Sequence, residues 1–312
     1  MVAQSSSAMP MDISHKQALA ALDPATLTAL KEPVDGPGLM RLAIHLLLLA
    51  MTGSLVAILH HPLLLIPALV LHGIVLVFLF TLEHEAIHGT AFRTAAINRI
   101  VAECAGFLLL LPPRYFRYFH FAHHRHTQDA GLDPELAAPR PRDVTEYAIH
   151  LSGIPYWRAQ IAVLTGNALG RTAHAFMPIG GRAAVKWEAR LYFAAYASLA
   201  IVTIHAGWIW PLWYWLIPAV LGQPFLRAYL LAEHAACPLV ADMLENTRTT
   251  FTNRAINLLA WNMPHHTAHH ALPVVPFHRL PQLTERLRPH LKVTAEGYVD
   301  AHRHIRAVWK RS

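Results

Sequence analysis

The sequence predicts an all-α integral membrane protein, with about four transmembrane helices in two hairpins and a helical, histidine-rich domain on the cytoplasmic side. Three observations support this fold class. Charged residues make up only 14% of the 312 residues, whereas about a quarter is ordinary for a soluble domain. Two long segments carry no Asp, Glu, Lys or Arg. The 23 histidines outnumber the 19 acidic residues, and many of them recur at helical spacing.

The two charge-free segments, 42–82 and 192–226, predict the transmembrane helices. Each is too long for one crossing, because the hydrocarbon core of a bilayer takes about 20 helical residues. Each segment therefore predicts a helical hairpin, with its turn at "LHHPLL" in the first and at "HAGWIWPLWYW" in the second. Trp and Tyr favour the membrane–water interface, as expected for the second turn. The predicted crossings are at about 42–59, 63–82, 192–208 and 212–231.

The distribution of basic residues predicts the orientation. Both turns lack Lys and Arg, and nearly all basic residues lie in 83–191 and in the segment after 226. Because Lys and Arg favour the cytoplasmic side, we expect both termini and the histidine clusters to face the cytoplasm, in a bacterial plasma membrane. The predicted organisation is a flexible cytoplasmic segment over 1–40, a membrane domain over 41–285 and a basic cytoplasmic tail over 286–312.

Other features limit the possible partners. The apolar run "CAGFLLLLPP" (104–113) is too short to span, so we expect it in the interface or packed beneath the histidine clusters. The two cysteines allow at most one disulfide and form no C-x-x-C metal pair. The net charge of +7 fits contact with anionic lipid headgroups and with an acidic electron carrier, and requires no nucleic acid.

The first histidine cluster has the spelling of a zinc-peptidase motif. His84 and His88 lie four residues apart in "HEAIH", so on a helix both rings fall on one face and reach one metal ion. In a zinc peptidase, Glu85 would be the general base. The bare pattern leaves this interpretation and other metal chemistry open.

Two further clusters carry the spacing H-x-x-H-H, in "HFAHHRH" and "HHTAHH", and one more histidine follows Glu in "LLAEH". Together the clusters offer nine imidazoles, whereas a catalytic zinc takes about three protein ligands. Two ions that share nine imidazoles would have four or five each. Imidazole suits Zn, Cu, Fe and Ni, so the ligand type does not by itself select iron.

The motifs "HEAIHG", "HFAHHRHTQDAGLDPEL", "AEH" followed by "NTRTT", and "NMPHHTAHHALPVVPFHRLPQL" resemble those of the integral-membrane fatty acid desaturases and their hydroxylase relatives. The resemblance runs from about residue 40 to about 285. It implies a non-haem pair of iron ions, with supporting roles for Glu85 and Asn262. The iron ligands that it implies are His84, His88, His120, His123, His124, His234, His266, His269 and His270.

The same resemblance implies an O2-dependent oxidation in which two hydrogens are removed from neighbouring methylenes of an acyl chain, leaving a cis double bond. No acid–base catalyst beyond the metal ligands is expected. Because the chain has no His-Pro-Gly-Gly haem motif, electrons are expected from a separate carrier such as a ferredoxin. The chain departs from the family pattern at His265, where the family has Tyr, and at Ala268, where it has Glu. The extra imidazole would compete for metal, and the missing carboxylate would no longer orient a neighbouring ring.

Three alternatives remain beside the desaturase. A carotenoid ketolase or hydroxylase, or an alkane-type hydroxylase, would use the same histidine clusters with another substrate. An intramembrane zinc metalloprotease would use "HEAIH" and leave the other clusters without a purpose. A metal transporter would carry ionisable residues inside its crossings, and the charge-free spans argue against it.

Overall fold

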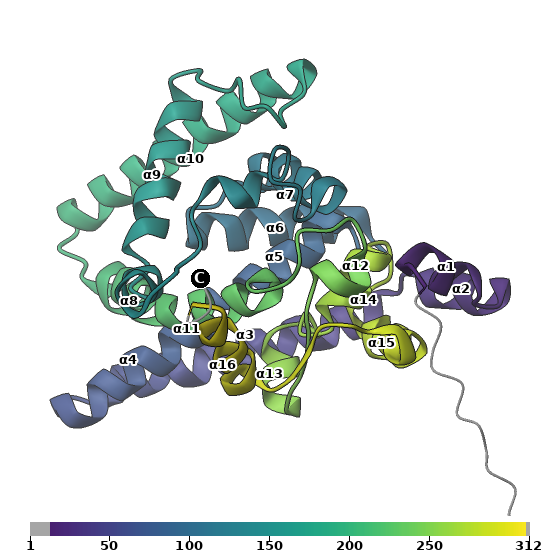
Figure 1. The fold of residues 1–312 in the computed structure, drawn as a ribbon. Coiled ribbons are helices and arrows are strands. Elements are labelled where there is room, and N and C mark those ends of the chain that lie inside the picture. The colour runs from purple at the N-terminus through teal and green to yellow at the C-terminus, as the bar shows by residue number, and fades with distance from the viewer. Residues whose placement is uncertain (1–12, 310–312) are drawn as a thin grey trace, which may run out of the picture.

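The computed structural model describes residues 13–309, and the regular secondary structure of this part of the chain is almost entirely helical (Figure 1). Two short strands, β1 (Thr249–Phe251) and β2 (Thr294–Glu296), pair in parallel with Thr250 opposite Ala295. The all-α prediction is therefore confirmed.

The helices up to the second histidine cluster are α1 (His15–Ala20), α2 (Pro24–Lys31), α3 (Asp35–Ile58), α4 (Pro62–Val77), α5 (Leu79–His88), α6 (Ala95–Leu109) and α7 (Pro113–His126). The later helices are α8 (Val144–Leu151), α9 (Ile154–Ala168), α10 (Arg182–His205), α11 (Ile217–His234), α12 (Met243–Asn246), α13 (Arg254–Leu259), α14 (His266–Ala271), α15 (Leu280–Leu287) and α16 (Tyr298–Trp309). Single helical turns lie at Pro134–Ala137, Ile179–Gly181, Leu212–Leu216, Phe277–Arg279 and Arg288–His290.

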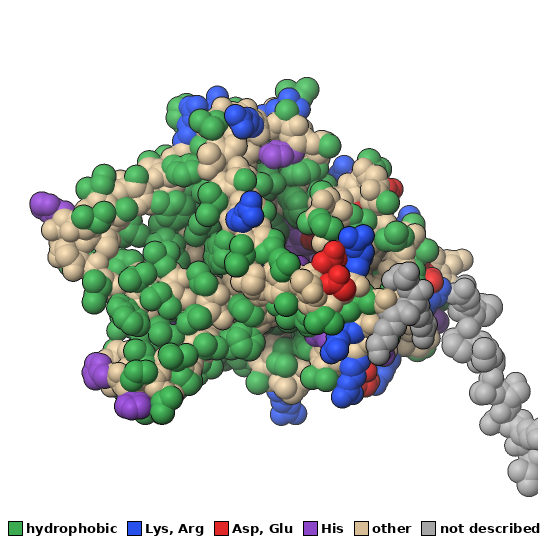
Figure 2. All heavy atoms as spheres, turned by 60° about the vertical axis from the view of Figure 1, so that its left-hand side comes forward, with side chains coloured by type: hydrophobic (Ala, Val, Ile, Leu, Met, Phe, Trp, Pro, Cys, Tyr) green, Lys and Arg blue, Asp and Glu red, His purple; other side chains and the backbone are tan. Residues whose placement is uncertain are grey.

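Three helical segments are long and apolar enough to cross a membrane: α3, the near-continuous α4–α5 pair, and Leu212–His234. The predicted crossings at 63–82 and 212–231 lie within these segments, and the one at 42–59 extends one residue beyond α3. The predicted crossing at 192–208 lies mostly in α10, which does not qualify. Its charged residues end only at Arg190 and the helix itself ends at His205, so too little apolar helix remains. Figure 2 shows a broad apolar face with charges gathered at its edges.

The apolar run 104–113 forms a corner between α6 and α7, which meet at 95°. Leu110 adopts a left-handed conformation (φ 56°), and Pro112 and Pro113 cannot continue the preceding helix. The two helices together qualify as one broken span, which would make four. Because α6 packs against α5, the run lies against the helix that carries the first histidine cluster, as expected.

The predicted domain boundaries at 40 and 285 fall inside α3 and α15. The described part of the N-terminal segment contains α1 and α2, with Leu30 buried. The segment after 285 was expected as a tail, but through residue 309 it is packed against the domain. Leu287 is fully buried, and Ile305 of α16 lies in a cluster with residues of α11. Apolar side chains at helical spacing along α16 account for this packing.

Close contact between α4 and α11 positions the C-terminal end of α11. A Cβ atom on Gly222 would lie 2.2 Å from the carbonyl oxygen of Gly73, and one on Gly73 would lie 2.1 Å from that of Pro218. Small residues at such a contact let two helix backbones touch inside a membrane. His234, at the end of α11, thereby lies beside histidines of α7 and α14.

Candidate metal centre

Four helices bring the nine predicted histidines together. α5 and α7 supply the first two clusters, α11 supplies the isolated histidine at its last residue, and α14 supplies the third H-x-x-H-H box. Within each helix the spacings of three and four residues turn the rings to one face. The nine histidines predicted as ligands therefore lie close together in the structure.

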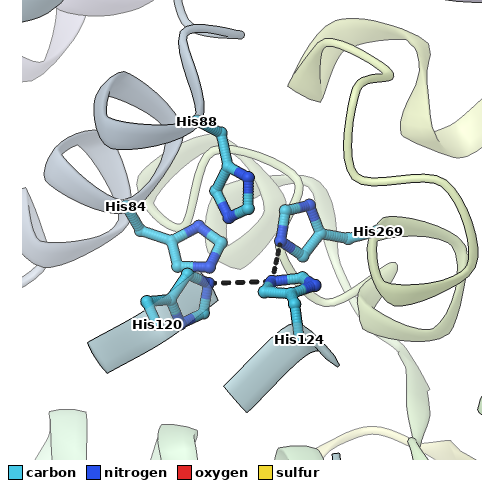
Figure 3. A group of neighbouring side chains, drawn as sticks. All are labelled: His84, His88, His120, His124 and His269. Atoms are coloured by element: carbon cyan, nitrogen blue, oxygen red, sulfur yellow. Dashed lines mark hydrogen bonds between the residues drawn. The ribbon is translucent and has the colours of Figure 1, made fainter. Parts of the chain in front are cut away.

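One group contains five of the rings, which point toward a shared centre (Figure 3). One ligand atom from each lies within 4.8 Å of every other. The Nε2 atom of His124 is 2.9 Å from that of His120 and 3.1 Å from that of His269. The five members are His84, His88, His120, His124 and His269.

The other four rings form a second group. Ligand atoms of His123, His234 and His270 lie within 4.8 Å of one another. The Nε2 atom of His266 is 3.1 Å from those of His234 and His270. The two groups adjoin, because the rings of His124 and His270 stack with their centroids 4.1 Å apart. The division into five and four matches two ions with four or five imidazoles each.

The outer nitrogens of three rings in the second group are held by other side chains or by the backbone. The Nδ1 atom of His123 lies 2.9 Å from Asp133, that of His234 lies 3.3 Å from the Asn246 carbonyl, and that of His270 lies 3.1 Å from the Thr127 hydroxyl. Such contacts fix the tautomer and the orientation of a metal-binding imidazole. Each ring is thereby fixed with Nε2 toward the centre.

Asp133 is built to remain a carboxylate. Burial alone would raise its pKa, but the hydrogen bonds from His123 and from the Gln128 and Glu135 backbone outweigh that effect and hold the pKa below its ordinary value. Its oxygens also accept backbone hydrogen bonds from Gln128 at 2.8 Å and Glu135 at 3.0 Å. An ionised carboxylate only accepts, so the proton of a neutral His123 ring lies on Nδ1.

With their protons on Nδ1, two rings of the second group turn unprotonated Nε2 atoms toward one another. The Asn246 carbonyl also only accepts, so His234 carries its proton on Nδ1 as well. The Nε2 atoms of His123 and His234 are 3.2 Å apart, and in neutral rings neither has a proton to share. A cation bound between such nitrogens removes this repulsion and uses both lone pairs.

The third box is electrostatically suited to a metal. Burial, followed by the neighbouring imidazoles, lowers the pKa of His266, His269 and His270 well below the ordinary value, so these rings are neutral at neutral pH. Both ring nitrogens of His84 and the Nε2 atom of His88 are buried and have no hydrogen-bond partner in the part of the chain that the structure describes. Opposite imidazole ligands of one ion lie about 4.2 Å apart, twice a metal–nitrogen bond of about 2.1 Å. The residues therefore fit metal ions.

Glu85 lies beside the histidine rings, and one of its oxygens accepts hydrogen bonds from residues outside the metal centre. It is fully buried, accepts hydrogen bonds from the Thr90 hydroxyl at 2.7 Å and the Phe277 backbone N–H at 3.2 Å, and has an oxygen 3.9 Å from Nδ1 of His269. Asn262 makes no such approach. It adopts a left-handed conformation (φ 58°) and donates to the Phe277 carbonyl, so its hydrogen bonds shape the turn before α14.

The two departures from the family pattern have separate outcomes. His265 does not join either group, because its Nδ1 atom lies 3.0 Å from the Thr284 hydroxyl and its ring packs toward α15. Ala268 is fully buried, and the carboxylate nearest to the third box is instead Glu233, with an oxygen 3.5 Å from Nδ1 of His266.

Several supporting residues that were not predicted lie inside the quoted motifs. Asp133 belongs to "QDAGLDPEL" and Asn246 to "NTRTT". Gln128 donates to the carbonyls of both His234 and Asn246. The buried Arg248 donates to the carbonyls of Ala232 and Ala235 at the end of α11. A polar residue in a motif between two histidine clusters was the available signal, but spacing alone does not tell which ring it touches.

Comparison with known proteins agrees with this geometry. The family model for fatty acid desaturases matches residues 60–302. The chain is 21% identical over 257 residues to the sn-1 acyl-lipid omega-3 desaturase (ferredoxin) of Nostoc sp. (strain 36), covering 74% of this chain and 68% of the relative. The match decides against the zinc-peptidase interpretation of "HEAIH". The chain is therefore an oxidoreductase that belongs to the fatty acid desaturase family.

Proposed function

We propose that the protein is an O2-dependent acyl-lipid desaturase that holds two non-haem irons and introduces a cis double bond into an acyl chain. The observation that carries the proposal is the arrangement of nine imidazoles in two adjoining groups, with the inner nitrogens of each group gathered at one centre. Nine nitrogen ligands are too many for one ion. The family and the acyl-lipid desaturase from Nostoc support a lipid substrate.

When bound, the irons would supply O2 activation and the oxidising equivalents that remove two hydrogens from neighbouring methylenes. The protein would contribute geometry. Asp133, Thr127 and the Asn246 carbonyl orient three of the rings. Aromatic side chains cover the centre on one side, with the Phe80 ring 6.2 Å from His84 and the Phe116 ring 5.4 Å from His120. Apolar walls exclude water and allow an acyl chain to approach.

The membrane setting and the electron donor complete the proposal. The α4–α5 span and the α11 span end at His88 and His234, which suits a centre at the cytoplasmic surface of a bacterial membrane. The Nostoc relative is described as a ferredoxin-type enzyme, and a chain with net charge +7 suits an acidic carrier. We therefore propose a ferredoxin-like protein as the electron donor.

Lipid analysis of a heterologous bacterial host tests this function. We expect a new cis double bond in membrane acyl chains when the wild type is expressed, and none with His269→Ala. The variant His265→Ala is the matched control, because that ring points away from both groups. A hydroxylated lipid or an oxygenated carotenoid in place of a new alkene would contradict desaturation and assign the protein to the hydroxylase or ketolase branch.

A further inference from the structure

Within residues 13–309, three hydrogen-bond donors on α9 and α11, outside the metal centre, are buried without a partner. They are the Nη2 atom of Arg227, the Nε2 atom of Gln223 and the indole nitrogen of Trp157. Gln223 is fully buried, whereas Arg227 and Trp157 are half-buried. A buried donor without a partner costs about 1–3 kcal/mol. Three together predict that an acceptor from outside the protein completes the site.

The donors belong to one small region. The amide oxygen of Gln223 accepts from Nε of Arg227 at 3.1 Å, which fixes the amide nitrogen as the free end. The guanidinium lies over the Tyr156 ring at 4.1 Å. Gly153 brings the helices close: a Cβ atom there would lie 2.7 Å from Cβ of Gln223 and 3.8 Å from the indole nitrogen of Trp157.

The charge of this region favours an oxygen ligand. Within residues 13–309, no carboxylate oxygen lies within salt-bridge distance of Arg227; Glu135 and Glu233 act on it only from farther away. The region also lies at the N-terminal end of the fifteen-residue helix α9, whose N-cap is Gly153. The backbone dipole there is positive. An arginine within a membrane-spanning helix marks a functional site by default, because its burial in lipid is costly.

The position relative to the metal centre is set by α11. Arg227 and His234 lie seven residues apart on this helix, which places them on the same face and about 10.5 Å apart along the axis. A ligand held by Arg227 would thus lie two helical turns from a histidine of the second group.

We propose that Arg227, Gln223 and Trp157 bind an oxygen at the carboxyl end of the acyl substrate, either the carboxylate of a free fatty acid or the ester carbonyl of a glycerolipid. The inference rests on the proposed function for the identity of the substrate, while the site itself follows from the unpaired donors. The acyl chain of the substrate would then be anchored at its carboxyl end. The position of the new double bond would be set by its distance from that end.

A binding measurement on iron-loaded, full-length protein in alkyl glycoside detergent tests the site. The probes are octadecanoate, its methyl ester and octadecane, which share one chain and differ only in the oxygen end. We expect the wild type to bind octadecanoate about tenfold or more tightly than octadecane. Arg227→Met should lose about tenfold for octadecanoate and nothing for octadecane. Gln223→Leu should weaken both oxygenated probes, and Arg158→Met, an exposed neighbour on α9, should change nothing.

The outcomes separate the ligand sources and the two proposals. A diacyl glycerolipid that displaces octadecanoate from the wild type but not from Gln223→Leu would assign the ester carbonyl; absence of displacement would assign the free carboxylate. Equal affinity of the wild type for all three probes, or an undiminished carboxylate preference in Arg227→Met, would overturn the inference. If Arg227→Met does not fold, Trp157→Phe, which removes the indole donor on α9, replaces it in the binding measurement. Loss of desaturation with intact carboxylate preference would count only against the proposed function.

Discussion

The carboxylate of Asp133 offers the sharpest test of how the ligands are held, through the substitution Asp133→Asn. One oxygen accepts from Nδ1 of His123 at 2.9 Å and from the Glu135 N–H at 3.0 Å, and the other accepts from the Gln128 N–H at 2.8 Å. An asparagine side chain has one oxygen and one NH2 group. The NH2 group would therefore face one of these N–H donors, and at least one hydrogen bond would be lost. Loss of a buried hydrogen bond to a charged group costs about 1.5–3 kcal/mol. Comparable partners of metal-binding histidines change metal affinity about 10–100-fold.

The assay is retention of iron by purified protein during dialysis against graded concentrations of a chelator. We expect Asp133→Asn to lose iron at about 10–100-fold lower chelator concentration than the wild type. Asp129→Asn is the matched control, because Asp129 is exposed in the same loop and its side chain accepts hydrogen bonds from the Gly131 and Leu132 N–H groups and from no histidine within residues 13–309. Equal iron retention by Asp133→Asn and the wild type would refute the argument that this carboxylate fixes the His123 ring.

Three further predictions concern the frame around the centre. Arg248→Met should remove the guanidinium hydrogen bonds to the Ala232 and Ala235 carbonyls at the end of α11. We expect it to lower the free energy of unfolding by about 1–3 kcal/mol per lost hydrogen bond and to reduce the iron content; an unchanged melting temperature and iron content would contradict this. Gly222→Ala should destabilise the protein by about 1–3 kcal/mol, because its Cβ would lie 2.2 Å from the Gly73 carbonyl oxygen. The control is Gly180→Ala, whose Cβ would meet no described atom within 4 Å. Equal thermal stability of the two variants would show that α4 and α11 do not touch. The pKa values of the third-box histidines are lowered in the folded protein, so below about pH 6.5 the unfolded chain binds protons that the folded one does not. The stability of metal-free protein should therefore fall as the pH drops below about 6.5, by up to about 1.4 kcal/mol per pH unit for each histidine; a flat thermal-denaturation profile between about pH 8 and pH 5 would be inconsistent with neutral, buried rings.

Much of the centre could be predicted from the sequence because its members follow local rules. Helical spacing turns His84 and His88 to one face, and absence of charge identifies apolar helices. The same locality explains the failures. A charge-free run does not say where its helix begins, so the crossing expected at 192–208 became part of α10, which starts among charged residues at Arg182.

Long-range pairing accounts for what sequence analysis could not supply. The contact between Asp133 and His123 depends on how the loop after α7 folds back, and that of Arg248 depends on the approach of a distant segment to α11. His265 was expected to compete for metal, yet its ring is turned to the Thr284 hydroxyl, which α15 supplies. Spacing gives the face of one helix, whereas the partner on the next helix depends on tertiary packing.

If the nine imidazoles hold two irons, metal analysis of detergent-purified protein, expressed with both iron and zinc available, will detect them. We expect two irons per chain in the wild type and a loss of iron in both His269→Ala, from the group of five, and His234→Ala, from the group of four. One zinc per chain without iron would contradict this expectation.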